Sequence, residues 1–158
     1  MGLLRALGGG FAGAVALTLV HETARRFIDD APRMDVVGMR AIAKSLRAAG
    51  QEVPVPLHEV ALAGDLVSNS LYYSLVGVGE ARTALVRGAL LGAAAGIGAV
   101  TLPGPLGLGQ APAARTPATA AMTIAWYTIG GLAAGAAFQL LGEETRGGSA
   151  PDGAAALS

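Results

Sequence analysis

Two His-Glu pairs are the residues of this chain best suited to metal chemistry. His21-Glu22 ends the first apolar stretch, and His58-Glu59 begins the second. If these stretches are antiparallel neighbours, both pairs lie at one membrane boundary, where imidazole and carboxylate could bind zinc, manganese or iron. The spacing matches no known metal signature, and adjacent residues point about 100° apart on a helix. The alternative is ordinary boundary polarity, with Glu22 paired to Arg25 three residues later.

A second polar set lies inside the apolar stretch 57–77, LHEVALAGDLVSNSLYYSLVG. Asp65, Asn69 and Tyr72 follow at offsets of four and three, and His58 lies seven residues before Asp65, so all four share one helical stripe. Unpaired polar groups are costly in hydrocarbon, so this stripe must face protein. An ionisable residue there indicates a path for protons, ions or polar solutes, or a buried catalytic carboxyl.

The structural alternative is that Asp65 forms hydrogen bonds between helices and fixes their packing. Its expected partners carry polar groups on the first and fourth apolar stretches: Thr18, Thr123, Trp126 and Tyr127. The predicted polar interior therefore consists of residues from the second and fourth stretches: Asp65, Asn69, Tyr72, Thr123, Trp126 and Tyr127.

The composition is that of an integral membrane protein. Of 158 residues, 53% are hydrophobic and 14% are charged, against about 25% charged in soluble domains. Four apolar stretches are each long enough to cross a bilayer: about 2–20, 57–77, 83–102 and 118–141. We therefore expect an all-α integral membrane protein, a four-transmembrane-helix bundle over residues 1–141, with a disordered polar tail over 142–158.

The first stretch has an alternative interpretation as a cleaved signal peptide, because a basic residue precedes it and Ala14-Val15-Ala16 resembles a cleavage site. Against this, the apolar run continues through Val20 into a charged segment compatible with a helix. A membrane span is therefore the preferred interpretation.

Glycines repeat at intervals of four residues in three of the stretches. Such spacing forms a flat strip on a helix, which lets another backbone approach closely. The members of these strips are Gly9 and Gly13, Gly88, Gly92 and Gly96, and Gly131 and Gly135. The pattern predicts a glycine zipper and a homo-oligomer.

Basic residues cluster in segment 21–56, which carries six of the eleven Lys and Arg residues. By the positive-inside rule this segment is cytoplasmic, so both termini lie outside the inner membrane. Within it, 32–49 is typical of an amphipathic helix, with Arg40, Lys44 and Arg47 on one face. Such a helix can lie on anionic headgroups at the membrane surface. The alternative is a solvated helix packed on the ends of the bundle.

The functional hypothesis is a small channel, carrier or membrane scaffold with a polar interior lined by the second span. The alternative is a membrane-embedded enzyme, possibly metal-dependent, acting on a lipid or quinone-like substrate through His21, Glu22, His58, Glu59 and Asp65. A divalent metal is the only candidate cofactor. We expect membrane lipids and a second copy of the chain as partners and no nucleic acid, because no basic motif remains beyond the amphipathic helix.

Overall fold

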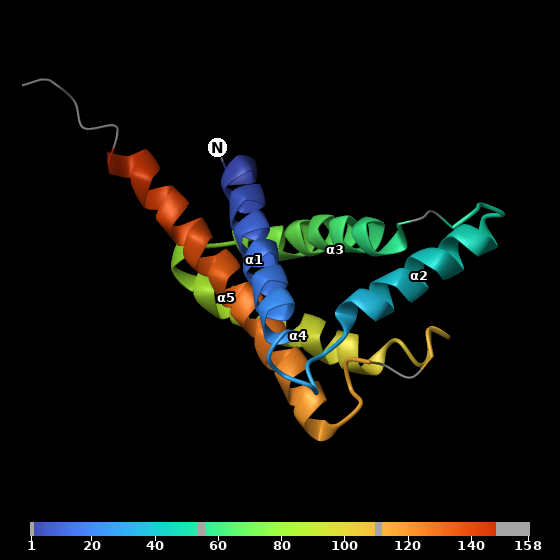
Figure 1. Ribbon diagram of the computed structural model, residues 1–158. Helices are drawn as coiled ribbons and strands as arrows, with labels where there is room; N and C mark the ends of the chain where they lie inside the picture. Colours follow the sequence, from blue (N-terminus) through green and yellow to red (C-terminus); the bar gives the residue numbers. More distant parts are fainter. Residues whose placement is uncertain (1, 54–55, 110–111, 148–158) are drawn as a thin grey trace, which may run out of the picture.

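The computed structural model describes residues 2–53, 56–109 and 112–147, and these are helical without any strand. Five α-helices follow one another along the chain: α1 (Gly2–Ala24), α2 (Met34–Ala48), α3 (Leu57–Tyr73), α4 (Ala84–Thr101) and α5 (Pro117–Gly147). Two short 3₁₀ helices, η1 (Ser74–Gly77) and η2 (Ala81–Thr83), connect α3 to α4. Figure 1 shows the N-terminus and the C-terminal end of α5 at one end of the molecule.

Three helical segments of the described chain are long and apolar enough to cross a membrane: Gly2–Ala24, Ala81–Thr101 and Pro117–Gly142. Many large apolar side chains on their outer faces are exposed, such as Leu4, Phe11 and Leu90. The described chain is therefore all-helical, with three helices suited by length and composition to a membrane. The α3 helix has 17 residues and is not among the three segments, so helix length does not establish the expected four-span bundle.

The helix boundaries differ from the predicted ones at several places. The first span, expected to end at about 20, continues as α1 to Ala24, and α3 ends at Tyr73 before the expected end at 77. The amphipathic helix expected over 32–49 begins at Met34 and ends at Ala48. The last helix continues to Gly147, beyond the expected start of a disordered tail at 142, because no proline interrupts this segment. The rest of the expected tail, 148–158, lies outside the described residues.

The α4 and α5 helices pack backbone to backbone through glycines. A Cβ atom on Gly88 would overlap the carbonyl oxygen of Gly131, and a Cβ atom on Gly131 would overlap that of Gly88. One turn further along α4, Gly92 faces the backbone of Tyr127 in the same way. A Cβ atom on Gly96 would lie 2.6 Å from the Cα atom of Ile124. These glycines therefore permit an approach that any side chain would prevent.

The α1 helix packs against α5 in a similar way. A Cβ atom on Gly9 would lie 3.0 Å from the carbonyl oxygen of Ala134, and one on Gly13 would lie 2.6 Å from that of Gly130. The strips predicted from the sequence thus lie at helix contacts within one subunit. The remaining member, Gly135, faces the carbonyl oxygen of Ala84 at the start of α4.

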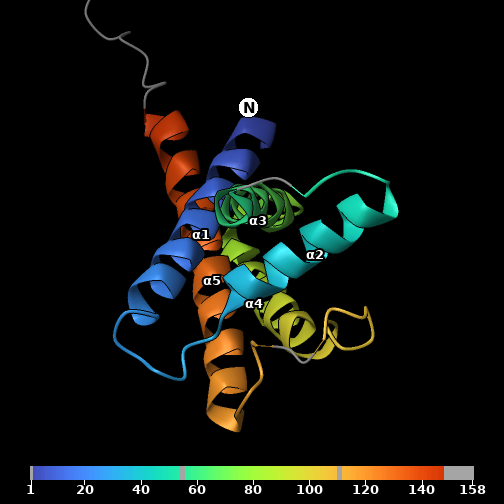
Figure 2. The ribbon, with the colours of Figure 1, turned by 45° about the vertical axis from the view of Figure 1, so that its right-hand side comes forward.

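The α3 helix and η1 run antiparallel to α1. Asp65 lines a cavity together with residues near the end of α1. Further along the segment, Ser70 and Ser74 face Gly10 of α1. Gly77 then contacts Ala6, near the start of α1. Figures 1 and 2 show α3 crossing the face of α1. The segment α3–η1 therefore passes from one end of α1 to the other.

The α1–α2 and α4–α5 connections are joined at one end of the molecule. The Arg115 guanidinium donates to the carbonyl oxygen of Asp29 over 3.2 Å, and the Thr119 hydroxyl donates to that of Asp30 over 3.1 Å. At the opposite end, the Gln139 side chain donates to the carbonyl oxygen of Ala81 at 2.9 Å. Thus the end of α1, the end of α4 and the start of α5 share one side of the fold.

Candidate functional site

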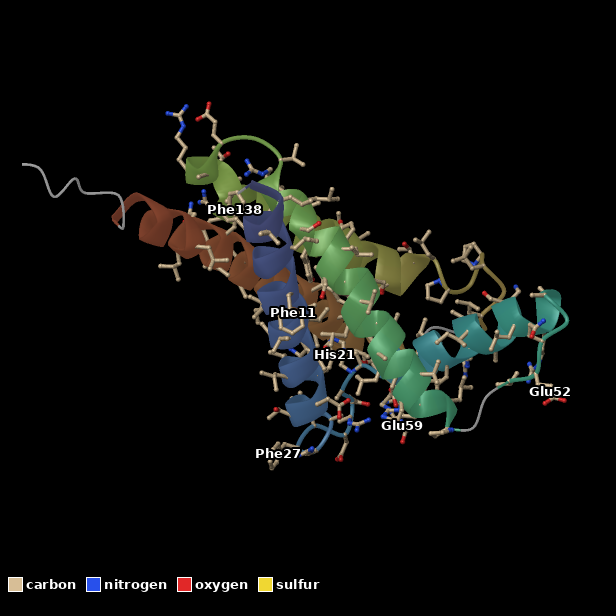
Figure 3. The ribbon with its side chains drawn as sticks, turned by 90° about the horizontal axis from the view of Figure 1, so that it is seen from above. Phe11, His21, Phe27, Glu52, Glu59 and Phe138 are labelled. Atoms are coloured by element: carbon tan, nitrogen blue, oxygen red, sulfur yellow. The ribbon has the colours of Figure 1, made fainter. Side chains whose placement is uncertain are left out.

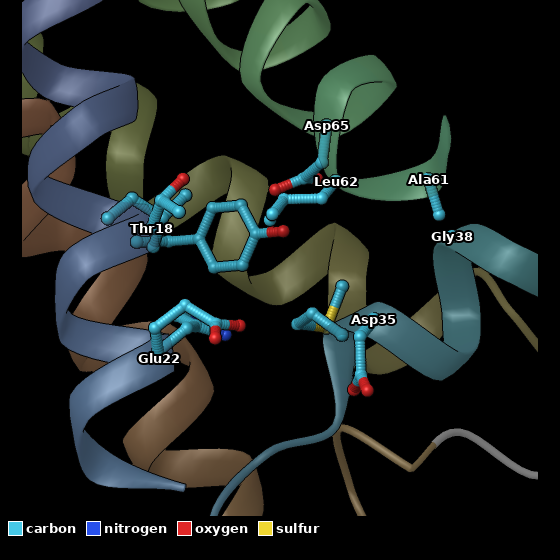
Figure 4. A pocket seen from close by; sticks show the side chains of 11 residues that line it. Thr18, Glu22, Asp35, Gly38, Ala61, Leu62 and Asp65 are labelled. Atoms are coloured by element: carbon cyan, nitrogen blue, oxygen red, sulfur yellow. The ribbon is translucent and has the colours of Figure 1, made fainter. Parts of the chain in front are cut away.

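A cavity of about 40 Å³ lies where α1, α2, α3 and α5 meet. This volume is enough for at least one water molecule. Apolar side chains close part of the cavity, and most of the remaining lining is polar: Thr18, His21, Glu22, Asp35, Asp65 and Tyr127. Figure 4 shows the side chains of Glu22 on α1 and Asp65 on α3 at the two sides of this space, with Asp35 on α2.

Two of the three carboxylates at the cavity form ion pairs. Glu22 pairs with Arg25 at 2.6 Å, which is the i,i+3 pair that the sequence predicted as the alternative to metal binding. Asp35 accepts two hydrogen bonds from Arg33, at 2.8 and 3.0 Å, and lies 3.6 Å from Arg25. Their charges are therefore largely compensated by arginines at the edge of the cavity.

Asp65 differs from the other two carboxylates. It is half-buried, and within the described part of the chain it forms no ion pair with any Lys, Arg or His. Its polar partner is the side chain of Asn69, one turn further along α3, which is itself buried. Asp65 is thus the carboxyl of the cavity whose charge no protein cation balances.

The ionisation of Asp35 can be followed from its surroundings, because α2 lies outside the membrane-spanning helices. Burial opposes its ionisation, but the hydrogen bonds and charge of Arg33, with a smaller contribution from Arg25, outweigh burial and hold the pKa of Asp35 below its ordinary value. The same hydrogen bonds raise the pKa of Arg33. Asp35 is therefore an ionised carboxylate at neutral pH.

His21 has one buried nitrogen that needs a partner. Its ring packs edge-on against Trp126 and Tyr127, with ring centroids 5.0 and 5.9 Å away. The Nε2 atom is buried and makes no hydrogen bond within the described residues. Buried polar atoms are almost always hydrogen-bonded to protein or to ordered water. Because His21 lines the cavity, a water molecule or solute held there could supply the missing partner.

The residues of the predicted polar interior do not lie along a single path. The Tyr72 hydroxyl donates to the carbonyl oxygen of Leu91 at 2.9 Å, so it joins α3 to α4. The Thr123 hydroxyl donates to the carbonyl oxygens of Thr119 and Ala113. Of these residues, Asp65 and Tyr127 line the cavity. Asn69 is hydrogen-bonded to Asp65, and Trp126 packs against His21.

The four proposed metal ligands do not gather at one point. His21 and Glu22 line the cavity, whereas His58 and Glu59 do not, and Glu59 is exposed at the start of α3 (Figure 3). No group of three His, Cys, Asp or Glu side chains in the described segments could hold a metal ion. The metal-dependent alternative therefore has no observation in its favour.

Two important residues were not predicted from the sequence. Asp35 reaches the cavity because α2 folds back on α3, where Gly38 faces Ala61. From the sequence alone, an acidic residue in the first turn of a helix, such as Asp35, indicates only a favourable interaction with the helix dipole. Tyr73 is fully buried and donates to the carbonyl oxygen of Tyr127 at 2.7 Å, whereas helical spacing had singled out its neighbour Tyr72.

The described chain is all-helical, has three helices suited by length and composition to a membrane, and has a cavity with several polar side chains near one end of α1. Comparison of the chain with models of protein families, with curated proteins and with solved structures gives no match.

Proposed function

We propose that this chain is a four-span inner-membrane carrier that binds a proton or a small monovalent cation in the cavity between α1 and α3. The observation that carries the proposal is a half-buried carboxyl, Asp65, which shares the cavity with the unpartnered Nε2 atom of His21. An intramembrane carboxyl without a protein cation is stabilised by a bound proton or cation.

The direction of the helices supports a fourth crossing. The end of α1, the end of α4 and the start of α5 lie on one side of the fold, because their connections are hydrogen-bonded. If all three helices cross the bilayer, the chain must return to the other side between α1 and α4. The segment available for this is α3–η1, whose 17 and 4 residues extend over about 33 Å. That length matches a hydrocarbon core of roughly 30 Å.

The charge distribution supports an orientation with the cavity facing the cytoplasm. Segment 21–56 carries six basic residues, which favours its retention inside. The cavity includes Glu22 and Asp35 from this same segment, so it lies near the cytoplasmic boundary. Both termini are then outside.

Close glycine packing supports a carrier over a pore through the subunit. The backbones of α4 and α1 lie directly against α5 at Gly88 and Gly13, which leaves no room for a solute between these helices. A bound ion could instead be exchanged by movement of the helices that cover the cavity, or at a contact between copies in a homo-oligomer.

The test is ion flux through the purified protein in phosphatidylcholine–phosphatidylglycerol liposomes, measured separately for protons, Na⁺ and K⁺. Asp65→Asn keeps the size of the side chain but abolishes its charge. We expect this change to lower the flux at least tenfold while thermal stability in detergent stays close to wild type. The matched control is Glu59→Gln, which removes an exposed carboxyl from the same helix and should leave the flux unchanged.

Two results would contradict the carrier. If liposomes with the wild-type protein show no more flux of any of the three ions than empty liposomes, a membrane scaffold is the remaining function. An Asp65→Asn variant that transports at the wild-type rate would remove the carboxyl from the mechanism.

A further inference from the structure

A larger groove lies between α2 and the part of the α4–α5 connection that contains Gly107 and Leu108. Its volume is about 530 Å³, within the range of ligand pockets. Three cationic side chains line it: Arg40, Lys44 and Arg47. The other side chains are apolar: Val36, Met39, Ala43, Leu57 and Leu108. It shares no lining residue with the cavity described above.

The second wall of the groove is held in place by the cations themselves. The Lys44 ammonium donates to the carbonyl oxygen of Leu106 at 2.6 Å, and the Arg40 guanidinium donates to that of Leu108 at 3.0 Å. Gly107 has a φ of +67°, and a Cβ atom there would lie only 2.6 Å from the Lys44 Nζ atom. The positive φ favours glycine at this point of the connection, whereas the flexible end of Lys44 could move away from an added side chain.

The described lining of the groove carries cationic side chains and no acidic ones. The backbone carbonyl that accepts the hydrogen bond from Lys44 carries no net charge to neutralise the ammonium group. The Arg47 side chain is exposed and makes no hydrogen bond or ion pair within the part of the chain that the structure describes. An anion is therefore the complementary ligand.

We propose that this groove binds one anionic phospholipid. Its phosphate would lie against Arg40, Lys44 and Arg47, and an acyl chain would lie against Met39 and Leu108. Charge complementarity selects the anion, and the apolar half of the groove selects a ligand with a hydrocarbon chain over free phosphate. The lipid is available because the protein has helices suited to a bilayer. This site differs from the expected flat contact of a basic helix with the membrane surface, because the α4–α5 connection gives it a second wall.

The experiment is native mass spectrometry of the full chain in detergent, titrated with dioleoylphosphatidylglycerol or dioleoylphosphatidylcholine. We expect one molecule of phosphatidylglycerol to remain bound at concentrations where phosphatidylcholine does not. Arg47→Gln should weaken phosphatidylglycerol binding by about fivefold, the factor expected for one basic residue near an anionic headgroup. Arg47→Lys keeps the charge and should retain most of the affinity.

The matched control is Arg26→Gln, which removes another exposed basic residue that lies outside the groove. This change should not alter lipid binding. Glycerol phosphate, which has the headgroup charge without acyl chains, should fail to displace the bound lipid. Equal binding of phosphatidylcholine, displacement by glycerol phosphate, or equal effects of Arg47→Gln and Arg26→Gln would each overturn the proposal.

Discussion

The contact between Gly88 of α4 and Gly131 of α5 allows a direct test of the packing. In Gly88→Ala, the added methyl group would overlap the carbonyl oxygen of Gly131 and lie 2.8 Å from its carbonyl carbon. These are backbone atoms, so the clash cannot be relieved by rotating a side chain. The two helices must separate, which also loosens the contact at Gly92.

The expected magnitude follows from two opposing terms. Inserting a methyl group into a closely packed contact costs about 1–3 kcal/mol. Replacing a glycine inside a helix by alanine stabilises the folded state by roughly 0.5–1 kcal/mol, because alanine loses less conformational freedom on folding. The net loss should therefore lie between about 0 and 2.5 kcal/mol of the free energy of unfolding, and near 1 kcal/mol at the midpoints of the two ranges.

A matched control lies on the same helix. A Cβ atom on Gly98 would be 3.4 Å from the Cδ1 atom of Leu102, which is the end of a flexible side chain. Gly98→Ala should therefore be neutral or stabilising by up to about 1 kcal/mol. Thermal unfolding in detergent, followed by the fluorescence of Trp126, compares the variants. The packing argument fails if Gly88→Ala unfolds at or above the temperature of Gly98→Ala.

Two further predictions concern the ion pair of Asp35 and the membrane topology. The folded-state pKa of Asp35 lies below its ordinary value of 3.8, so the stability contributed by its contact with Arg33 is present above that pH and is lost as the pH falls through the folded-state pKa. Because Arg33 is about half exposed, with 48% of its side chain accessible, Asp35→Asn should cost only about 1 kcal/mol of the free energy of unfolding at pH 7. If the variant melts as far below wild type at pH 3 as at pH 7, this prediction is wrong. The chain has no cysteine, so the single variants Gln51→Cys and Val78→Cys report the topology. A membrane-impermeant maleimide added to intact cells should label the cysteine at position 78 and not the one at position 51. Equal labelling would contradict a membrane crossing between the two positions.

Much of the fold follows from local features of the sequence. Apolar length indicated the three helices suited to a bilayer, and the four-residue spacing indicated which glycines lie on one helix face. Period alone could not say which helix each strip contacts. The contacts depend on matching glycines of α5: Gly130 contacts Gly13 of α1, and Gly131 contacts Gly88 of α4.

The polar residues were harder to place, because their partners are distant in the sequence. Helical period put Asp65 and Tyr72 on one stripe, but α3 crosses different neighbours along its length (Figures 1 and 2). Tyr72 therefore reaches the backbone of α4 at Leu91, while Asp65 faces α1 and α2. The inclusion of Asp35 depends on how α2 folds back, which no local pattern in the sequence encodes.

The location of the cavity follows from where the close packing stops. Glycines bring α1 to α5 as far as Gly13, and the α1 sequence from there to Ala24 contains no further glycine. In this last part the rings of His21 and Trp126 lie between the helices, and bulky side chains hold the backbones apart.

The resulting space is covered by α2 and α3, where Gly38 faces Ala61, and not by another closely packed helix. Backbone contacts between α1, α4 and α5 resist separation, whereas α2 is held to the rest largely by side chains and by the Arg40 and Lys44 hydrogen bonds to the α4–α5 connection. If Asp65 exchanges an ion with the cytoplasm, the element that moves to admit it is therefore α2.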